Sequence, residues 1–208
     1  MTLNMSAPIA VIDFETTGMT PAQGARATEV AIVLLQDGQV VDRFASLMQT
    51  GVRIAPFITR LTGITNAMVA AAPPAAAVMQ EAARFVGPAP LVAHNAAFDR
   101  KFWQSELHHA GLPAPQPFAC TVLLARRLYP DAPSHKLGAL IDHLGLPRAG
   151  RAHRALADAE MAAALLARMQ HDLQQRYGLP WPSHALLQRL QACKRTALDQ
   201  MLASAWAL

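Results

Sequence analysis

Cysteine, aromatic residues and charge are all scarce in this sequence. Of its 208 residues only Cys120 and Cys193 are cysteine, 6% are aromatic and 15% are charged. Two distant cysteines do not make the disulfide framework of a small secreted domain. Residues 1–8 lack the basic and apolar regions of a secretory leader, and the most apolar run, residues 68–79, contains prolines and is too short to span a bilayer. These absences predict a soluble, cytoplasmic protein.

Apolar residues, in contrast, are abundant. They make up 52% of the chain, which is enough for a hydrophobic core and argues against global disorder. The length fits one domain, or one domain with a short appendage. The formal net charge is +4, and this mild basic excess favours polyanionic partners without identifying one.

The first fifty residues carry a strand pattern. Residues 9–12 form an unbroken apolar run that ends at Asp13, as expected of a strand covered on both faces. Residues 29–35 and 39–47 are two further strand candidates, and the Asp37-Gly38 pair between them is a strong hairpin signal. An antiparallel meander of three strands is therefore predicted.

Later in the chain, strands alternate with helices. We expect strands at residues 91–94 and 118–120, and helices at residues 73–85, 98–109, 121–128, 136–144 (capped by Ser134) and 155–176. With the meander, this order predicts an α/β fold, a mixed five-stranded sheet flanked by helices. A weak boundary at Gly178 separates a first domain, residues 1–178, from a C-terminal extension, residues 179–208, in which Ser183 caps one extra helix that reaches Trp206.

Asp13 and Glu15 stand two residues apart at the end of the first strand. Side chains at positions i and i+2 point to the same face of a strand, so the two carboxylates are expected to project together. Like charges at the end of a buried strand are costly unless a cation neutralises them. By itself, the pair is equally consistent with a solvated acidic turn before Thr16-Thr17-Gly18.

A third acid follows the fourth strand. Asp99 lies at the start of a helix, after the polar pair His94-Asn95. An acid in a first turn can simply complement the helix dipole, but this role leaves His94-Asn95 unexplained. The carboxyl ends of neighbouring strands lie close together, and open α/β folds place their sites there. We therefore expect Asp99 to lie near Asp13 and Glu15.

His153 and Asp158 complete the set. Five residues advance a helix by well over a turn, so we expect His153 in the lead-in to the last long helix and Asp158 in its second turn, with the imidazole folded back over the carboxylate. Four carboxylates form a hard-oxygen site suited to two Mg²⁺ or Mn²⁺ ions, and ligands at zinc spacing are lacking. Two such ions can clamp a phosphodiester while a histidine takes the proton of the attacking water.

These three segments resemble the motifs of the DEDDh 3′–5′ exonuclease family. Asp13-Phe14-Glu15-Thr16-Thr17-Gly18 resembles the first motif, His94-Asn95-Ala96-Ala97-Phe98-Asp99 the second, and the spacing of His153 and Asp158 the third. Order and approximate spacing agree over about residues 8–170, and the chain looks most similar to members such as the proofreading epsilon subunit of bacterial replicative DNA polymerase. The resemblance implies a ribonuclease H-like fold, in agreement with the predicted sheet.

The resemblance also implies roles for matching residues. It implies that Asp13, Glu15, Asp99 and Asp158 bind the metal ions and that His153 is the general base. It implies substrate contacts for Thr16, Thr17, Thr62, Ile64, Asn95 and Phe98. Two positions depart from the family pattern: Thr62 stands where histidine is frequent, and Cys120-Thr121 stands where an Asp-Thr pair is frequent. Neither position is a predicted metal ligand, so the departures concern the substrate and not the chemistry.

The expected activity is removal of nucleoside monophosphates from 3′ ends of single-stranded DNA. A 3′–5′ exoribonuclease has the same chemistry and stays an alternative. A polymerase-associated subunit that acts mainly by interaction is a third, because the helix after Ser183 carries a Leu/Met stripe; packing of this stripe on the protein's own core is the favoured interpretation. Arg126-Arg127 and the stretch 148–154 are candidate phosphate contacts, and the latter is better placed because it leads into His153.

Overall fold

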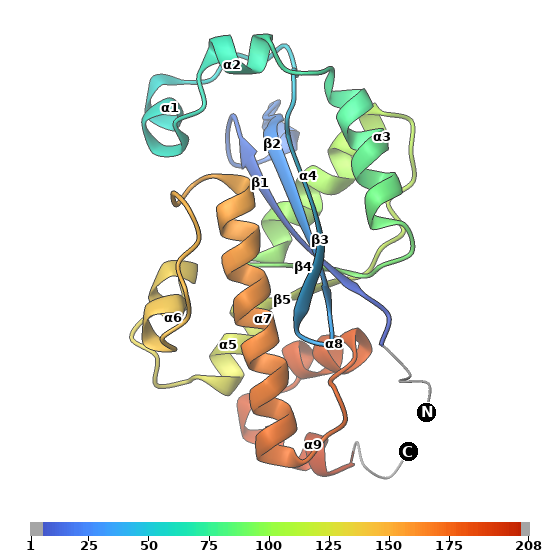
Figure 1. Cartoon of the computed structure of the whole chain (residues 1–208), viewed down its shortest axis with the longest axis vertical. Coiled ribbons are helices and arrows are strands. Elements are labelled where there is room, and N and C mark those ends of the chain that lie inside the picture. The colour runs from blue at the N-terminus through green and yellow to red at the C-terminus, as the bar shows by residue number, and fades with distance from the viewer. Residues whose placement is uncertain (1–5, 205–208) are drawn as a thin grey trace.

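A single mixed sheet organises the fold. In the computed structural model, which describes residues 6–204, its strands are β1 (Ile9–Thr16), β2 (Ala27–Gln36), β3 (Gln39–Leu47), β4 (Leu91–Ala93) and β5 (Phe118–Cys120). The strand order is β3-β2-β1-β4-β5. The β1–β2 and β2–β3 pairs are antiparallel, whereas β4 runs parallel to both β1 and β5 (Figure 1). The predicted five-stranded mixed sheet is confirmed.

The β2–β3 hairpin turns at the Asp37-Gly38 pair, as predicted. Both residues have a positive φ, 48° and 78°, which is the combination found in a type I′ turn. The side chain of Trp181 packs on this turn, and a Cβ at Gly38 would lie 2.8 Å from its ring. The turn therefore requires glycine both for its backbone angles and for the close approach of the indole.

Helices cover both faces of the sheet. They are α1 (Pro56–Thr62), α2 (Asn66–Ala70), α3 (Ala75–Val86), α4 (Ala96–His109), α5 (Thr121–Leu128), α6 (Leu137–His143), α7 (Ala155–Tyr177), α8 (His184–Ala192) and α9 (Leu198–Ser204), with short 3₁₀ turns at Pro21–Gln23 and Arg195–Ala197. The long helix α7 crosses β1 and β2 on one face, and α3 and α4 lie on the other side of the sheet (Figure 1).

The alternation of β1 places its acidic end on the α7 side. Ile9 and Val11 join the core cluster that contains the α7 side chains, whereas Ala10, Ile12 and Phe14 join the cluster formed with α3 and α4. Side chains two residues apart share a face. The odd-numbered acids of this strand therefore project toward the N-terminal end of α7.

Helix α6 begins later than predicted. Its N-cap is Lys136, in extended backbone conformation, and not Ser134. The Ser134 hydroxyl instead accepts a hydrogen bond from the Lys136 N–H at 3.3 Å, within the loop that precedes the helix. The prediction that Ser134 caps this helix is therefore wrong by two residues.

The C-terminal segment is not one helix. Ser183 caps α8 as predicted, because its hydroxyl accepts a hydrogen bond from the Leu186 N–H, but the helix stops before Cys193, which is extended. A 3₁₀ turn then leads into α9. The break lets both helices pack on the core that α7 shares; the buried leucines are Leu187, Leu190, Leu198 and Leu202. Residues 1–5 and 205–208, which include the predicted helix end at Trp206, lie outside the described residues.

Helix α8 also covers the edge of the sheet at β5. The side-chain oxygen of Gln191 accepts a hydrogen bond from the Cys120 N–H at 2.7 Å, and its amide nitrogen donates to the Phe118 carbonyl at 3.4 Å. The Gln188 side chain also donates to the Phe118 carbonyl, at 3.3 Å, so two glutamines of α8 bind backbone groups of this edge strand. The apolar stripe of the extension packs on the protein's own core, which was the favoured interpretation. Among the described residues, no helix is both long and apolar enough to cross a membrane.

Candidate active site

Asp13 and Glu15 lie at the C-terminal end of β1, on the side of α7. In the antiparallel register Asp13 stands opposite Ala31, and Glu15 stands opposite Glu29. The register shifts between Glu15 and Thr16, which is the irregularity of a β-bulge. Bulges occur frequently beside active sites, where they change the direction of a side chain.

Asp99 reaches the same place from the other side of the sheet. It sits in the first turn of α4 and is only 2% exposed. Its Oδ1 accepts a hydrogen bond from the Phe14 N–H at 3.2 Å, which ties α4 to the strand between Asp13 and Glu15. Asn95, the residue before the helix, has a φ of 73°, a left-handed conformation that asparagine tolerates better than most residues.

His153 and Asp158 come from the start of α7. Asp158 is in the first turn of the helix, slightly earlier than predicted, and its Oδ2 accepts a hydrogen bond from the His153 N–H at 3.1 Å. His153 is exposed and has a φ of 61°, which is uncommon for a residue other than glycine. Ligand atoms of Glu15, His153 and Asp158 all lie within 4.8 Å of one another. The three segments predicted to converge are therefore brought together.

Glu29 and Arg154 hold this arrangement in place. Neither of these two roles was predicted from the sequence. Glu29 is 5% exposed; its carboxylate accepts hydrogen bonds from the Arg154 guanidinium, the shortest at 2.7 Å, and from the Ala155 N–H at 3.0 Å. Such a bidentate pair fixes geometry as well as charge. It anchors the first residue of α7, and hence His153 and Asp158, to the strand next to Glu15. The available signal was an acid inside the apolar run of β2.

The carboxylates crowd one another in a poorly hydrated place. Burial raises the pKa of Asp13 well above its usual range, and the charges of Asp99 and Asp158 raise it further. Burial together with Asp158 and Glu29 raises the pKa of Glu15 to about 8, although Arg154 opposes this. Burial raises the pKa of Asp99 to about 8 as well. A group of acids that resists ionisation without a counter-charge fits a cation-binding site.

These pKa shifts predict how pH acts on the metal-free protein. Glu15 and Asp99 have folded-state pKa values near 8, above the ordinary values near 4 of the unfolded chain. The folded state therefore binds more protons between these limits, and stability falls as pH rises from about 4 to about 8. We expect the melting temperature in EDTA to drop by roughly 5–10 °C across this window. Saturating Mn²⁺ or Mg²⁺ should remove most of the drop.

Differential scanning fluorimetry at a series of pH values measures this effect. Asp99→Asn serves as the matched variant, because it removes one raised carboxyl group and also one of the charges that raise the pKa of Asp13. Its melting temperature in EDTA should depend less on pH than that of the wild type. If the melting temperatures of the two proteins depended on pH in the same way, the charge of Asp99 would not destabilise the folded protein.

Two cavities meet at the acidic cluster. The smaller, of about 220 Å³, is lined by Glu15 and Thr16 and by apolar side chains. Three of these, Met19, Phe57 and Leu61, are 76%, 62% and 50% exposed. Large apolar side chains left exposed beside a charged site are typical of a place where a flat apolar ligand binds.

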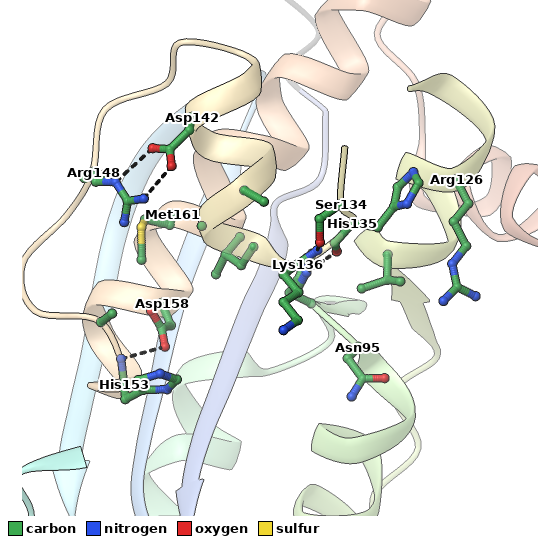
Figure 2. A pocket seen from close by; sticks show the side chains of 16 residues that line it. Asn95, Arg126, Ser134, His135, Lys136, Asp142, Arg148, His153, Asp158 and Met161 are labelled. Carbon is green, nitrogen blue, oxygen red and sulfur yellow. Dashed lines mark hydrogen bonds and ion pairs between the residues drawn. The ribbon is translucent and has the colours of Figure 1, made fainter. Parts of the chain in front are cut away.

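The larger cavity, of about 880 Å³, lies on the other side of the cluster. His153 and Asp158 line it, and so do Asn95, Arg126, Lys136 and Arg148. Figure 2 shows Lys136 between the His153–Asp158 pair and Arg126 in this view. The two cavities thus differ in character, one small and apolar, the other large and bordered by cations.

The residues implied as substrate contacts are distributed unevenly. Thr16, Thr62 and Phe98 line the small cavity, and Asn95 lines the large one. The Thr62 hydroxyl, however, is buried and already donates to the Ile58 carbonyl and accepts from the Ile64 N–H.

Ile64 and Thr17 are placed elsewhere. Ile64 is 1% exposed and packs in a separate small cluster with Ile54, Ile58 and Val69. The Thr17 hydroxyl accepts a hydrogen bond from the Arg26 N–H at 3.0 Å. The Leu61-to-Thr65 segment is therefore the end of α1 and the turn that leads to α2, and Leu61 and Thr62 are its residues that line the small cavity.

Most arginines proposed as phosphate contacts are already engaged. Arg148 forms an ion pair with Asp142 at 2.6 Å, and Arg154 is bound to Glu29. Arg151 lies against Gly63, where a Cβ would stand 2.6 Å from its Nη1. In the stretch 148–154, Arg154 thus holds the site together and Arg148 is neutralised by Asp142.

The chain resembles known nucleases along most of its length. A family model described as Exonuclease (RNase_T) matches residues 10–166. The 3′-5′ exonuclease DinG of Bacillus subtilis (strain 168) is 38% identical over 184 residues, which cover 86% of this chain and 19% of DinG. A PolC-type DNA polymerase III of Clostridium perfringens (strain 13 / Type A) is 40% identical over 156 residues, 75% of this chain and 11% of the polymerase.

The similarity extends to solved structures. The structure of exonuclease X in complex with 5′ overhanging duplex DNA superposes with a TM-score of 0.69 at 30% identity, covering 88% of this chain and 99% of that chain. The chain therefore spans about a fifth or less of the length of the two curated relatives, but nearly all of the exonuclease X chain.

Proposed function

Because the chain belongs to the RNase T-like exonuclease family, as a DEDDh 3′–5′ exonuclease domain, we propose that it hydrolyses single-stranded DNA from the 3′ end and releases nucleoside 5′-monophosphates. The observation that carries the proposal is the convergence of four carboxylates and one histidine. Glu15, His153 and Asp158 lie close together and line two unlike cavities, and the charges of Glu15, Asp99 and Asp158 all act on Asp13. Two free cysteines support a reducing compartment such as the cytoplasm as part of this proposal.

The family is metal-dependent, and the donor set of this chain fits divalent cations. The residues that would hold two Mg²⁺ or Mn²⁺ ions are Asp13, Glu15, Asp99 and Asp158. All are hard oxygen donors, and their raised pKa values are those of a cluster that needs a counter-charge. Such ions, when bound, lower the cost of forming hydroxide from water and of placing charge on the departing 3′-oxygen.

His153 is proposed as the general base. Its imidazole is exposed, so it can exchange a proton with solvent, and it lies beside Glu15 and Asp158. The water oxygen forms a bond to phosphorus, its proton passes to His153, and the bond between phosphorus and the 3′-oxygen breaks. The products are a nucleoside 5′-monophosphate and a strand with a new 3′-hydroxyl group, which receives a proton from solvent.

The two cavities support a direction for the strand. A 3′-terminal nucleoside carries a base but no further phosphate on its 3′ side, so it suits the small apolar cavity of Phe57 and Leu61. The rest of the strand continues through phosphates, and it suits the larger cavity bordered by Arg126 and Lys136. Thr16 and Phe98 line the small cavity and are proposed to contact the terminal nucleotide, and Asn95 the next one. Thr17, Thr62 and Ile64 are proposed to act indirectly, by shaping the backbone next to the residues that line the small cavity.

Oligonucleotide digestion tests the function. We expect a 5′-labelled single-stranded DNA to give a ladder that shortens from the 3′ end with Mg²⁺ or Mn²⁺, and EDTA to stop the reaction. A matched RNA and a duplex with a recessed 3′ end are compared on the same gel. Faster digestion of RNA would replace the DNA proposal by an exoribonuclease, and activity that persists in EDTA would refute the metal-dependent mechanism.

Proofreading beside a polymerase is a second candidate. It is favoured by the 40% identity to a PolC-type DNA polymerase III, of which this chain matches only a small part. Faster removal of a mismatched than of a paired 3′ nucleotide supports it. We also propose that residues 1–178 form the exonuclease domain and residues 179–208 a C-terminal helical extension, whose helix α8 covers the β5 edge.

A further inference from the structure

Two cations in the large cavity have no partner within the described part of the chain. Lys136 and Arg126 are exposed, and neither side chain forms a hydrogen bond or an ion pair with any other described residue. The third cation of the cavity, Arg148, is already neutralised by Asp142. In Figure 2, dashed lines join Arg148 to Asp142, whereas none joins the side chain of Lys136 or Arg126 to any residue drawn.

The loop that carries Lys136 is held firmly. The His94 Nε2 faces the His135 carbonyl at 3.1 Å, so this nitrogen donates a proton, and the Nδ1 accepts from the Thr121 hydroxyl at 2.8 Å. The His135 Nε2 in turn donates to the Tyr129 carbonyl at 3.1 Å. Two imidazoles thus tie the residue before Lys136 to the end of β4 and to the end of α5. Lys136 therefore lies on a loop that hydrogen bonds hold in a fixed position.

Local structure does not account for Lys136. It occupies the N-cap of α6, where Ser, Thr, Asp and Asn are preferred because their oxygens accept hydrogen bonds from the first turn. A cation at this end of a helix also opposes the helix dipole. Arg126 differs, because it lies in the last turn of α5, where a cation is favourable. An electrostatic cost at Lys136, in a cavity next to the carboxylate cluster, points to an anion that binds there.

We propose that Lys136 and Arg126 bind the phosphates of the nucleotides on the 5′ side of the scissile bond. This inference rests on the proposed function, and it assigns the large cavity to the continuing strand. The strand carries one negative charge per nucleotide, and the cations would also offset the repulsion between that strand and the acidic cluster. Lys136 and Arg126 therefore select substrates with several nucleotides, but take no part in bond cleavage.

Two substrates of different length test the assignment. The p-nitrophenyl ester of thymidine 5′-monophosphate has the terminal nucleotide and the scissile phosphate but no nucleotide on the 5′ side. Oligothymidylates have the full strand. In Lys136→Ala/Arg126→Ala, we expect the KM for oligothymidylates to rise about tenfold with kcat unchanged. The slope of log(kcat/KM) against log salt concentration should become less steep by about 0.7 for each lost contact. Hydrolysis of the ester should be unchanged.

The control is Lys194→Ala/Arg195→Ala, which removes the same two residue types. Both residues are exposed and lie at the junction of α8 and α9, outside the two cavities. It should behave as the wild type with both substrates. An oligothymidylate KM and salt slope unchanged in the Lys136 variant, or altered equally in the control, would overturn the inference. If the wild type cleaved neither substrate, the proposed function itself would fail, which is a distinguishable result.

Discussion

Asp13→Asn and Asp158→Asn are each expected to lower the rate of 3′-end hydrolysis by at least about 10³-fold. Stabilisation of the developing charges by bound cations contributes several kcal/mol to the barrier, and each 1.4 kcal/mol corresponds to about a tenfold change in rate. Asparagine keeps the shape of aspartate but removes the charge that holds a cation. The loss should be measured as single-turnover release of the 3′ nucleotide over a range of Mg²⁺ or Mn²⁺ concentrations.

The same variants distinguish loss of chemistry from loss of folding. Burial and neighbouring charges raise the pKa of Asp13, so replacement by a neutral residue should leave the metal-free protein at least as stable as the wild type at pH 8. Asp131→Asn is the matched control, because Asp131 is exposed and outside both cavities. A folded Asp13→Asn protein with near-normal activity would remove Asp13 from the proposed metal site.

His153→Asn is expected to lower kcat by about 10²–10⁴-fold, the usual contribution of a general base, with a much smaller change in KM. Asparagine is the informative replacement, because it tolerates the positive φ of this position and has no basic nitrogen. The loop and its backbone hydrogen bond to Asp158 should therefore persist. The pH profile of the rate should differ between the wild type and the variant, because the variant has lost the group that takes the proton of the water.

Two further measurements sharpen the role of His153. His143→Ala removes another exposed imidazole, from the last turn of α6, and should leave the pH profile unchanged. Added imidazole should restore part of the activity of His153→Gly, since it supplies the missing base while glycine keeps the positive φ available. A variant whose pH profile follows that of the wild type would assign the proton transfer to another group.

Much of the candidate site follows from local pattern. The apolar run that ends at Asp13 predicts a strand, and its period of two places Glu15 on the same face. Likewise, the five-residue spacing of His153 and Asp158 predicts a loop residue followed by a helical one. These features depend on neighbours in the chain, and the structure places them accordingly.

Other features depend on contacts that local pattern does not encode. The helical spacing of apolar residues continues through Cys193, so the break between α8 and α9 was not foreseen; it arises because the leucines of both helices pack on one core. Similarly, Ile64 lies in a motif that the resemblance links to substrate, but packing against Ile54 and Ile58 buries its side chain.

The acidic cluster shows which features the sequence determines and which the tertiary structure decides. The sequence alone determined which residues are proposed to carry the chemistry and in which order, because strand and helix periods are local and the motif residues are few. Only the tertiary structure placed Glu29 opposite Glu15 and joined it to Arg154, since that pairing depends on the register of β1 with β2 and on the position of α7. It also brought Lys136 of the α6 N-terminus and Arg126 of α5 to one cavity. Such long-range neighbours are decided by sheet register and helix packing, which no local period records.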